Sequence, residues 1–437
     1  MRFTATELAD ALGGELVGPD VTVDGVAIDS RLLRPGALFA AVRGERDGHD
    51  FVAAAAGAGA AAVLVERVDD GAVGSMSAVL VPSVDDALAG LARLARSRLG
   101  DRVVGITGSV GKTTTKDLLA SVLAQRFRTA ASEKSFNNEL GVPLTLANAA
   151  DDTEAAVIEM GARGQGHISL LCDLARPTVG VVTLVAAVHS EFMGGLDRIM
   201  EAKRELIESL PSSGVAVLNA DDDRVAAMAA ATSARVLLFG STGDVRAERV
   251  RLDEELHATF DLVDGDGRVE LRLGVRGEHN VANALAAAAA ASALGVSLDQ
   301  IATGLAAPVL SPWRMELHRT PAGAVVLNDA YNANPTSMAA ALRSLAALEG
   351  DRRIAVLGYM AELGADEGTE HRQVAALTRS LGIDVIAVGT ELYGVDPVAD
   401  VDAALDALGT VGAGDVVLVK ASRMAGLERV AAALVGE

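Results

Sequence analysis

Short apolar runs recur along the chain, separated by stretches in which apolar residues return every three or four positions. The runs predict buried strands, and the longer stretches predict helices with one buried face. The predicted strands are residues 37–42, 61–65, 102–107, 155–159, 179–184, 215–218, 324–328, 354–357, 385–388 and 416–419. Strands that alternate with helices form parallel sheets covered by helices, so the pattern predicts an α/β protein with doubly wound sheets.

Two segments depart from this alternation. Residues 247–275 have the pattern of antiparallel hairpins, and Asp264-Gly265-Asp266-Gly267 predicts the turn between two strands. The alanine-rich stretch 282–293 predicts a buried helix, because alanine has the highest helix propensity.

The pattern also divides the chain. At roughly 100–200 residues per domain, 437 residues predict two to four domains. The pattern of predicted strands and helices changes before the strand at 102–107 and again at Ser311-Pro312-Trp313. We therefore predict three domains, formed by residues 1–98, 99–310 and 311–437.

Composition narrows the class of protein. With 38 Lys and Arg against 59 Asp and Glu, the net charge is −21, which argues against nucleic acid or an anionic membrane surface as a partner. Hydrophobic residues make up 50% of the chain, enough for a large core. Cys172 is the only cysteine, so neither an internal disulfide nor a cysteine zinc cluster is available. No apolar run reaches the ~18 residues of a membrane span, and the first residues lack a secretory pattern, so we expect a cytoplasmic protein.

A glycine-rich segment, Thr107–Thr114, lies between a predicted buried strand and a predicted helix. Its glycines let backbone N–H groups face phosphate oxygens, Lys112 can reach the terminal phosphates, and Thr113 can bind Mg²⁺. The strict GxxxxGK[ST] pattern is not met, because Ile106 stands where its first glycine belongs. A plain strand-to-helix turn is the alternative, but it gives no packing reason for Gly-Lys-Thr-Thr here. The predicted phosphate-binding residues are Gly108, Ser109, Gly111, Lys112, Thr113 and Thr114.

Two polar residues follow other predicted strands. Glu159 ends the strand 155–159, and His189 follows the apolar run 179–188. The carboxyl ends of parallel strands form the ligand crevice of such sheets, where a carboxylate can bind Mg²⁺ and a neutral imidazole a second metal ion. A solvated acid at a strand end and a structural histidine are the alternatives.

Lys203 stands in the apolar stripe of the predicted helix 197–210, between Ile199 and Leu206. The usual interpretation is a lysine whose ammonium reaches back to solvent. The alternative is a buried amine with a lowered pKa, which is open to chemical modification.

A polar cluster follows the predicted strand 324–328. Asn334 before Pro335 predicts a helix N-cap. Helix capping accounts for Asn334 but not for Asp329, Tyr331 and Asn332. We therefore predict that this polar cluster forms a binding site.

Together, these motifs resemble those of the Mur ligases over essentially the whole chain. The runs Phe136-Asn137-Asn138-Glu139 and Asn328–Pro335 are the most specific, and they are similar to those of the family member that adds D-alanyl-D-alanine. Further matching segments are Ile28–Arg31, Asp47–Phe51, Thr107–Lys116, Gly141–Pro143, Ile158–Gly161, Glu201–Lys203, Gly277–Asn283 and Lys420–Arg423.

The resemblance implies a three-domain α/β enzyme. A small α/β N-terminal domain would bind a UDP-sugar, a central P-loop ATPase-type parallel sheet would bind ATP and Mg²⁺, and a Rossmann-like C-terminal domain would close as a lid. The implied substrate-binding residues are Ser30, Arg31, Asp47 and His49 for the UDP-sugar, Asn137 and Asn138 for the muramoyl-peptide, and Tyr331, Asn332 and Asn334 for the incoming dipeptide. The implied nucleotide-binding residues beyond the phosphate loop are Asn280, Asn283, Arg314 and Asp329. The implied catalytic residues are Lys112, Glu159, His189 and Lys203, and the implied metal ligands are Thr113, Glu159, His189 and a carbamylated Lys203.

The implied activity is the ATP-dependent joining of D-alanyl-D-alanine to a UDP-muramoyl-tripeptide, a step of peptidoglycan precursor synthesis. The reaction passes through an acyl phosphate and releases ADP and phosphate. The implied partners are small molecules only, and the expected state is a monomer.

Two positions depart from the family pattern. Ala421 stands in Lys420–Arg423 where glycine is common, which is a mild change. Tyr359 stands in Gly358–Gly364 where the family usually has aspartate, so a Mur-like ligase for a different amine remains an alternative, in secondary metabolism or of the folylpolyglutamate type. A phosphate-loop regulatory protein is the alternative from another class, but the guanine-reading Asn-Lys-x-Asp segment is absent from the sequence.

Overall fold

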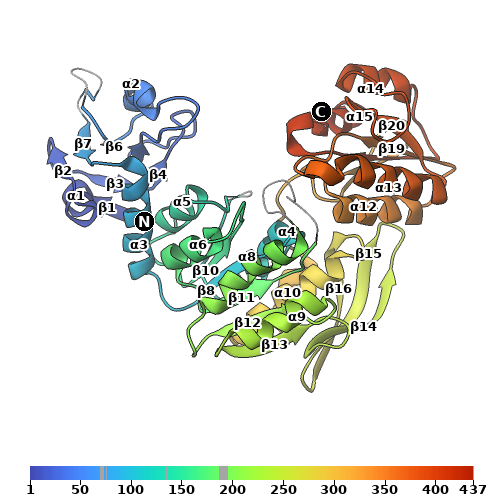
Figure 1. Ribbon diagram of the computed structural model, residues 1–437, viewed down its shortest axis with the longest axis horizontal. Helices are drawn as coiled ribbons and strands as arrows, with labels where there is room; N and C mark the ends of the chain where they lie inside the picture. The colour runs from blue at the N-terminus through green and yellow to red at the C-terminus, as the bar shows by residue number, and fades with distance from the viewer. Residues whose placement is uncertain (69–72, 75, 134–135, 187–194, 437) are drawn as a thin grey trace.

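The computed structural model describes residues 1–437 except 69–72, 75, 134–135, 187–194 and 437. Figure 1 shows three bodies along an arc, with the N-terminal and C-terminal bodies at its ends and the central one between them. We call them the first, central and third units.

The first unit is built on a five-stranded sheet of order β2-β7-β6-β5-β4 and a two-stranded sheet of β1 and β3. β4 to β7 run parallel and β2 is antiparallel to β7. The strands are β1 (Arg2–Thr4), β2 (Glu15–Val17), β3 (Thr22–Asp24), β4 (Val26–Ala27), β5 (Leu38–Ala40), β6 (Ala62–Val65) and β7 (Ser77–Leu80). The helices are α1 (Ala5–Leu12), α2 (Val52–Gly57) and α3 (Val84–Arg98).

The central unit contains a nine-stranded sheet of order β16-β15-β14-β13-β12-β11-β8-β10-β9. The strands from β8 to β13 pair in parallel, while β14, β15 and β16 form antiparallel hairpins that extend the same sheet. The strands are β8 (Val103–Thr107), β9 (Thr129–Ala131), β10 (Ala155–Glu159), β11 (Val179–Val182), β12 (Val215–Asn219), β13 (Arg235–Phe239), β14 (Val245–Leu252), β15 (His257–Asp264) and β16 (Gly267–Arg276). The helices are α4 (Lys112–Leu123), α5 (Gly141–Ala147), α6 (His167–Ala175), α8 (Leu196–Glu208), α9 (Asp223–Ala226), α10 (Asn280–Ala293) and α11 (Leu298–Ala306).

Successive side chains of β8 point to opposite faces of the sheet and pack into two different hydrophobic cores. Val104 and Ile106 belong to the cluster that contains α4, α10 and α11, whereas Val103 belongs to the cluster that contains α3, α5, α6 and α8. The alanines of α10 from Ala284 to Ala291 are almost completely buried. Their small side chains let α10 lie close against α4, the helix that follows the glycine-rich loop.

The third unit has a five-stranded sheet of order β17-β18-β21-β19-β20, in which only β17 is antiparallel. The strands are β17 (Glu316–Arg319), β18 (Val325–Asn328), β19 (Arg352–Leu357), β20 (Asp384–Ala387) and β21 (Asp415–Lys420). The helices are α12 (Pro335–Ala347), α13 (Glu367–Ser380), α14 (Val401–Leu408) and α15 (Glu428–Val435).

The α/β architecture with three units is confirmed, and so are the hairpins within 247–275 and the buried alanine helix. The parallel core of each larger sheet is confirmed as well, and antiparallel pairs outside the predicted hairpins join β2 to β7 and β17 to β18 at the edges of these sheets. The boundaries predicted after residues 98 and 310 stay predictions, and they fall between α3 and β8 and between α11 and β17. No helix in the described part of the chain is long and apolar enough to cross a membrane.

Candidate active site

The glycine-rich loop joins the end of β8 to the start of α4. Gly108 has a φ of +143°, and a Cβ atom there would lie 1.9 Å from the hydroxyl of Thr183. Gly111 has a φ of +89°, and a Cβ atom there would lie 2.3 Å from Oδ1 of Asn283. Both positions therefore require glycine, for conformation and for space.

The first turn of α4 presents its backbone N–H groups without a side-chain cap, because Gly111 is the N-cap residue. The N-terminus of a helix attracts anions through these free donors and the helix dipole. Lys112 Nζ donates a hydrogen bond to the carbonyl of Gly108 at 2.7 Å, so the ammonium folds back over the loop. Burial lowers the pKa of Lys112, and the carboxylate of Glu159 opposes that shift. The loop thus brings backbone N–H donors and the ammonium of Lys112 together at the N-terminus of α4.

Glu159 ends β10, beside the end of β8, and its side chain is buried. The amide of Asn137 donates a hydrogen bond to its Oε1 at 2.9 Å. Its Oε2 is buried and has no hydrogen-bond partner among the residues that the structure describes. Buried polar atoms are nearly always paired, and a carboxylate oxygen is a ligand that Mg²⁺ prefers, so the orphaned oxygen suits a cation beside the loop.

The side chain of Lys203 on α8 is 2% exposed, so its ammonium does not reach bulk solvent. Burial, and then the positive charge of Lys112, lower the pKa of Lys203 to about 7. The sequence left two alternatives for Lys203, an ammonium that reaches back to solvent and a buried amine. The structure shows the buried amine.

Two asparagines of α10 lie behind the glycine-rich loop. Asn283 donates a hydrogen bond to Oδ1 of Asn280 at 2.7 Å and accepts one from the hydroxyl of Thr115 at 3.3 Å. Asn280 in turn donates to the carbonyl of Arg276 at 2.6 Å. These bonds tie α10 to the first turns of α4 and orient both amides.

The third unit faces this loop with the ends of β18 and β21. Because these strands are parallel neighbours, Asp329 and Lys420 lie at the same sheet edge and form an ion pair. Lys420 also donates to the carbonyl of Asn332 at 2.9 Å. The guanidinium of Arg314 lies 4.2 Å from the ring centre of Tyr331, a cation–π contact. Lys420 lines the pocket but was not among the predicted site residues, although its position at a strand end was a usable signal.

A pocket of about 500 Å³ lies between these two groups of residues. Of the predicted residues, it is lined by Ser109, Gly111, Lys112, Thr113, Thr114, Asn137, Glu159, Asn280, Asn283, Arg314, Asp329, Tyr331, Asn332 and Asn334. Residues that were not predicted also line it, including Arg163, Glu362, Ser422 and Arg423. Asn334 caps α12 in a capping box as well, so its predicted cap is confirmed.

The residues predicted for the UDP-sugar lie in the first unit, and none of them lines this pocket. Asp47 accepts a hydrogen bond from Nδ1 of the buried His49 at 2.7 Å, and Nε2 of His49 accepts one from the backbone of Glu66 at 2.9 Å. Both nitrogens of His49 therefore bind protein groups. Arg31 is exposed and pairs with Asp29.

Three other predicted residues are placed differently or not placed. Asn138 does not line the pocket, and its Oδ1 accepts a hydrogen bond from the backbone of Gly141 at the start of α5. Ser30 is half-buried in the first unit. His189 lies outside the described residues. Within the described residues, no group of three or more His, Cys, Asp and Glu side chains could hold a metal ion.

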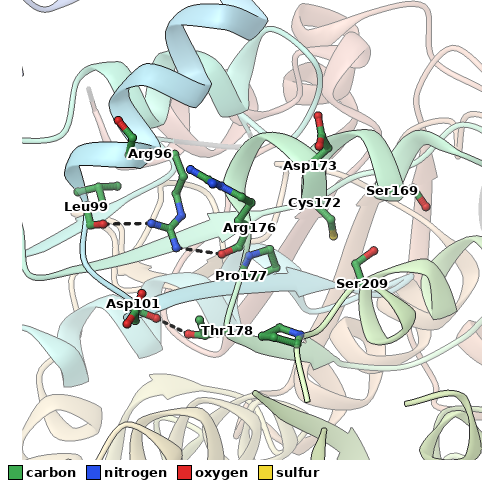
Figure 2. Close-up of a pocket in the computed structure, with 12 residues that line it drawn as sticks. Arg96, Leu99, Asp101, Ser169, Cys172, Asp173, Arg176, Pro177, Thr178 and Ser209 are labelled. Atoms are coloured by element: carbon green, nitrogen blue, oxygen red, sulfur yellow. Dashed lines mark hydrogen bonds between the residues drawn. The ribbon is translucent and has the colours of Figure 1, made fainter. Parts of the chain in front are cut away.

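A second hollow, of about 800 Å³, contains none of the predicted residues (Figure 2). It lies at the opposite ends of β8 and β11, where α3 leads into the central sheet. The buried Arg96 donates hydrogen bonds to the carbonyls of Ala175, Arg176 and Leu99, at 2.6, 3.0 and 3.1 Å. This guanidinium joins the last turn of α3 to the end of α6, which is a structural role.

Comparison with protein families covers most of the chain. The Mur ligase family catalytic domain matches residues 22–98, the Mur ligase middle domain matches 106–291, and the Mur ligase glutamate ligase domain matches 313–423. The UDP-N-acetylmuramoyl-tripeptide–D-alanyl-D-alanine ligase of Mycobacterium tuberculosis is 42% identical over 100% of this chain and 98% of its own length. The chain belongs to the Mur ligase family.

Solved Mur ligase structures share the whole fold. MurF from Acinetobacter baumannii superposes with a TM-score of 0.89 and 32% identity, over 100% of this chain and 99% of its own. MurF from Thermotoga maritima, solved in complex with ADP, gives a TM-score of 0.81 and 31% identity, over 95% and 98% of the two chains. This Mur ligase is therefore an ATP-dependent, ADP-forming ligase, and the alternative of a regulatory phosphate-loop protein is wrong.

Proposed function

We propose that this Mur ligase joins D-alanyl-D-alanine to a UDP-N-acetylmuramoyl-tripeptide at the expense of ATP, as a step of peptidoglycan synthesis. The observation that carries the proposal is the pocket between the phosphate loop and the third unit, together with full-length similarity to ligases of that name. A Mur-like ligase for another amine finds no similar support among these relatives, so the dipeptide is the amine we expect.

The triphosphate of ATP would lie on the free N–H groups of α4, with Lys112 at its terminal phosphates. Asn280 and Asn283 hold α10 against the loop from the side that we assign to the nucleoside. Arg314 and the Asp329–Lys420 pair line the pocket from the third unit.

Mg²⁺ fits beside the loop, because Oε2 of Glu159 is buried without a partner in the described part of the chain and Thr113 lines the same pocket. We assign Thr113, Glu159, His189 and a carbamylated Lys203 as its ligands. A buried lysine with a pKa of about 7 holds much of its amine neutral near pH 7, and a neutral amine adds to CO₂ with loss of a proton. The product is a carboxylate at a place where an ammonium is costly. When bound, the metal supplies charge neutralisation between two anions.

The reaction begins with the carboxylate of the tripeptide, which is a poor electrophile. Its oxygen attacks the terminal phosphorus of ATP, so that a new P–O bond forms and the bond to ADP breaks. Lys112 and the helix N-terminus stabilise the negative charge that builds up on the transferred group.

The amine of D-alanyl-D-alanine then attacks the acyl carbon. A tetrahedral intermediate forms, the amine loses its proton, and the C–O bond to phosphate breaks to leave the amide. Because the pocket has walls from two units, their approach would exclude the water that hydrolyses an acyl phosphate. We assign Asn137 and Asn138 to the muramoyl-peptide, Tyr331, Asn332 and Asn334 to the dipeptide, and Ser30, Arg31, Asp47 and His49 to the UDP-sugar.

The test is a coupled phosphate-release assay with ATP, Mg²⁺, a panel of UDP-muramoyl-peptides and a panel of amines. We expect release with the tripeptide and D-alanyl-D-alanine, and none when either is left out. Turnover with another amine and none with D-alanyl-D-alanine would contradict the proposal. We propose that the enzyme acts in the cytoplasm and as a monomer.

A further inference from the structure

A loop of the third unit, Gly358–Gly364, forms part of the pocket wall. Its residues Ala361, Glu362 and Leu363 line the pocket beside Ser422. Glu362 has a φ of +65°, a backbone conformation that a residue with a side chain adopts at a cost. The loop therefore needs contacts that hold it in this shape.

Two of these contacts come from the end of β21, on the pocket side. The backbone of Ala361 donates a hydrogen bond to the hydroxyl of Ser422 at 2.8 Å, and the backbone of Ser422 donates to the carbonyl of Tyr359 at 3.0 Å. These bonds fix the loop to a neighbouring strand end.

The other contacts come from behind the loop and centre on His371 of α13, whose side chain is fully buried. Its Nε2 accepts a hydrogen bond from the backbone of Met360 at 3.1 Å. Its Nδ1 donates to the carbonyl of Glu367 at 2.8 Å, one turn earlier on the same helix. Only the neutral imidazole with its proton on Nδ1 can make both bonds.

Two tyrosines enclose this imidazole. The ring of Tyr359 stacks on it at 5.6 Å between centres, and the ring of Tyr393 meets it edge-on at 5.0 Å. The hydroxyl of Tyr393 donates to the carbonyl of Gly358 at 2.8 Å, so it anchors the start of the same loop. Tyr359, which departs from the family pattern, thus covers His371.

We propose that His371 is a positioning residue of the ligase reaction, which holds Gly358–Gly364 in the shape that the third-unit wall of the pocket requires. The imidazole acts through the backbone of Met360 and does not line the pocket itself. Tyr393 is the second anchor of the loop. The assignment of the pocket to the ligase reaction rests on the proposed function, whereas the anchoring of the loop does not.

Two substitutions distinguish between the two hydrogen bonds of His371, to Met360 and to Glu367. A glutamine carries an acceptor near the place of Nε2, so His371→Gln keeps the bond to Met360, while the shorter His371→Asn reaches only the place of Nδ1. We expect His371→Asn to lower kcat/KM for D-alanyl-D-alanine at least tenfold and to leave KM for the UDP-muramoyl-tripeptide within twofold. His371→Gln should stay within threefold of the unmodified enzyme. His318→Gln, on the edge strand β17 and outside the pocket lining, is the matched control and should change nothing.

Hydrogen exchange at the amide of Met360 tests the anchoring without any turnover. The amide should be protected in the unmodified protein and in His371→Gln, and should exchange at least tenfold faster in His371→Asn. Equal protection in His371→Asn would overturn the inference, and so would equal kinetic losses in the Gln and Asn variants. If the His371 variants unfold, Tyr393→Phe tests the anchoring of the loop in their place. This variant removes one hydrogen bond to the loop, so it should also lower kcat/KM for the dipeptide. Absence of turnover in the unmodified enzyme refutes the proposed function and leaves the exchange result to decide the anchoring.

Discussion

At the scale of single residues, the candidate site combines groups that are costly to bury. The lysine on α8 and the glutamate at the end of β10 are both buried, yet neither is explained by packing. An apolar side chain at either place would fill the space without the cost of desolvation. We therefore attribute their presence beside a phosphate loop to the metal-binding role that we propose for them.

Removal of the ammonium at the glycine-rich loop should stop turnover. We expect Lys112→Ala to lower kcat by roughly 10²–10³-fold, because it removes a preorganised positive charge from the phosphoryl group that is transferred. The thermal unfolding midpoint should change little, since the partners of Lys112 among the described residues are carbonyls of its own loop. Arg224→Ala, on the exposed side of α9, is the control. Turnover close to normal in Lys112→Ala would contradict the role.

The carbamate can be tested by chemical rescue. Lys203→Ala should lose activity, and added short-chain carboxylates should restore part of it, because they can occupy the place of the missing carbamate. The measurement is the phosphate-release rate as a function of acetate or formate concentration. Complete activity in Lys203→Ala without any additive would refute the carbamate.

At the scale of elements, the small side chains of α10 determine how near it lies to α4. Ala288 is buried in the same core cluster as side chains of α4, so we expect a larger side chain there to displace its neighbours. The glycine-rich loop depends on this approach, because Asn283 of α10 bonds to Thr115 of α4.

Overpacking of this contact should destabilise the protein. We expect Ala288→Leu to lower the free energy of unfolding by about 1–3 kcal/mol, the usual cost of extra methylene groups in a filled core. Ala11→Leu places the same side chain on the exposed face of α1 and should change stability by less than about 0.5 kcal/mol. Denaturant unfolding of both variants measures the difference. An equal change in the free energy of unfolding at both positions would show that the core around α10 can accept a larger side chain.

Sequence reasoning worked where one short segment contains both the chemistry and its setting. The phosphate loop was predictable because a strand, its glycines and a helix are consecutive, and the cap at Asn334 because Pro335 follows it. The ion pair of Lys420 with Asp329 was not, because its partners are 91 residues apart and meet only through the order of strands in a sheet. The engagement of His49 with Asp47 and Glu66 depends likewise on tertiary contacts.

At the scale of the whole molecule, several imidazoles are buried in neutral form. Burial lowers the pKa of His257 and of His371 below the usual value of 6.5. The unfolded chain therefore binds protons in a range where the folded chain does not. Their contribution to stability is present in full above the unfolded value and is lost as the pH falls through 6.5 toward the lower folded value.

Urea unfolding between pH 7.5 and 5.5 should show this dependence. We expect the free energy of unfolding to fall with decreasing pH, by at most about 1.4 kcal/mol per pH unit for each buried imidazole. His257→Gln should have a smaller decline than the unmodified protein, because it removes one of these groups. An identical decline in both would assign the dependence to other groups.

The pocket draws its walls from the central unit and the third unit, and Asp117 of α4 also accepts a hydrogen bond from the backbone of Ser311 in the segment between them, at 2.7 Å. A nucleotide that touches both walls binds only while both units are folded and apposed. Its binding free energy, about 2.7 kcal/mol at a concentration of 100 times Kd, then stabilises the pair as one body. We therefore expect the central and third units to unfold as a single cooperative unit when ATP is present, in which case the substrate is also a structural element of the enzyme.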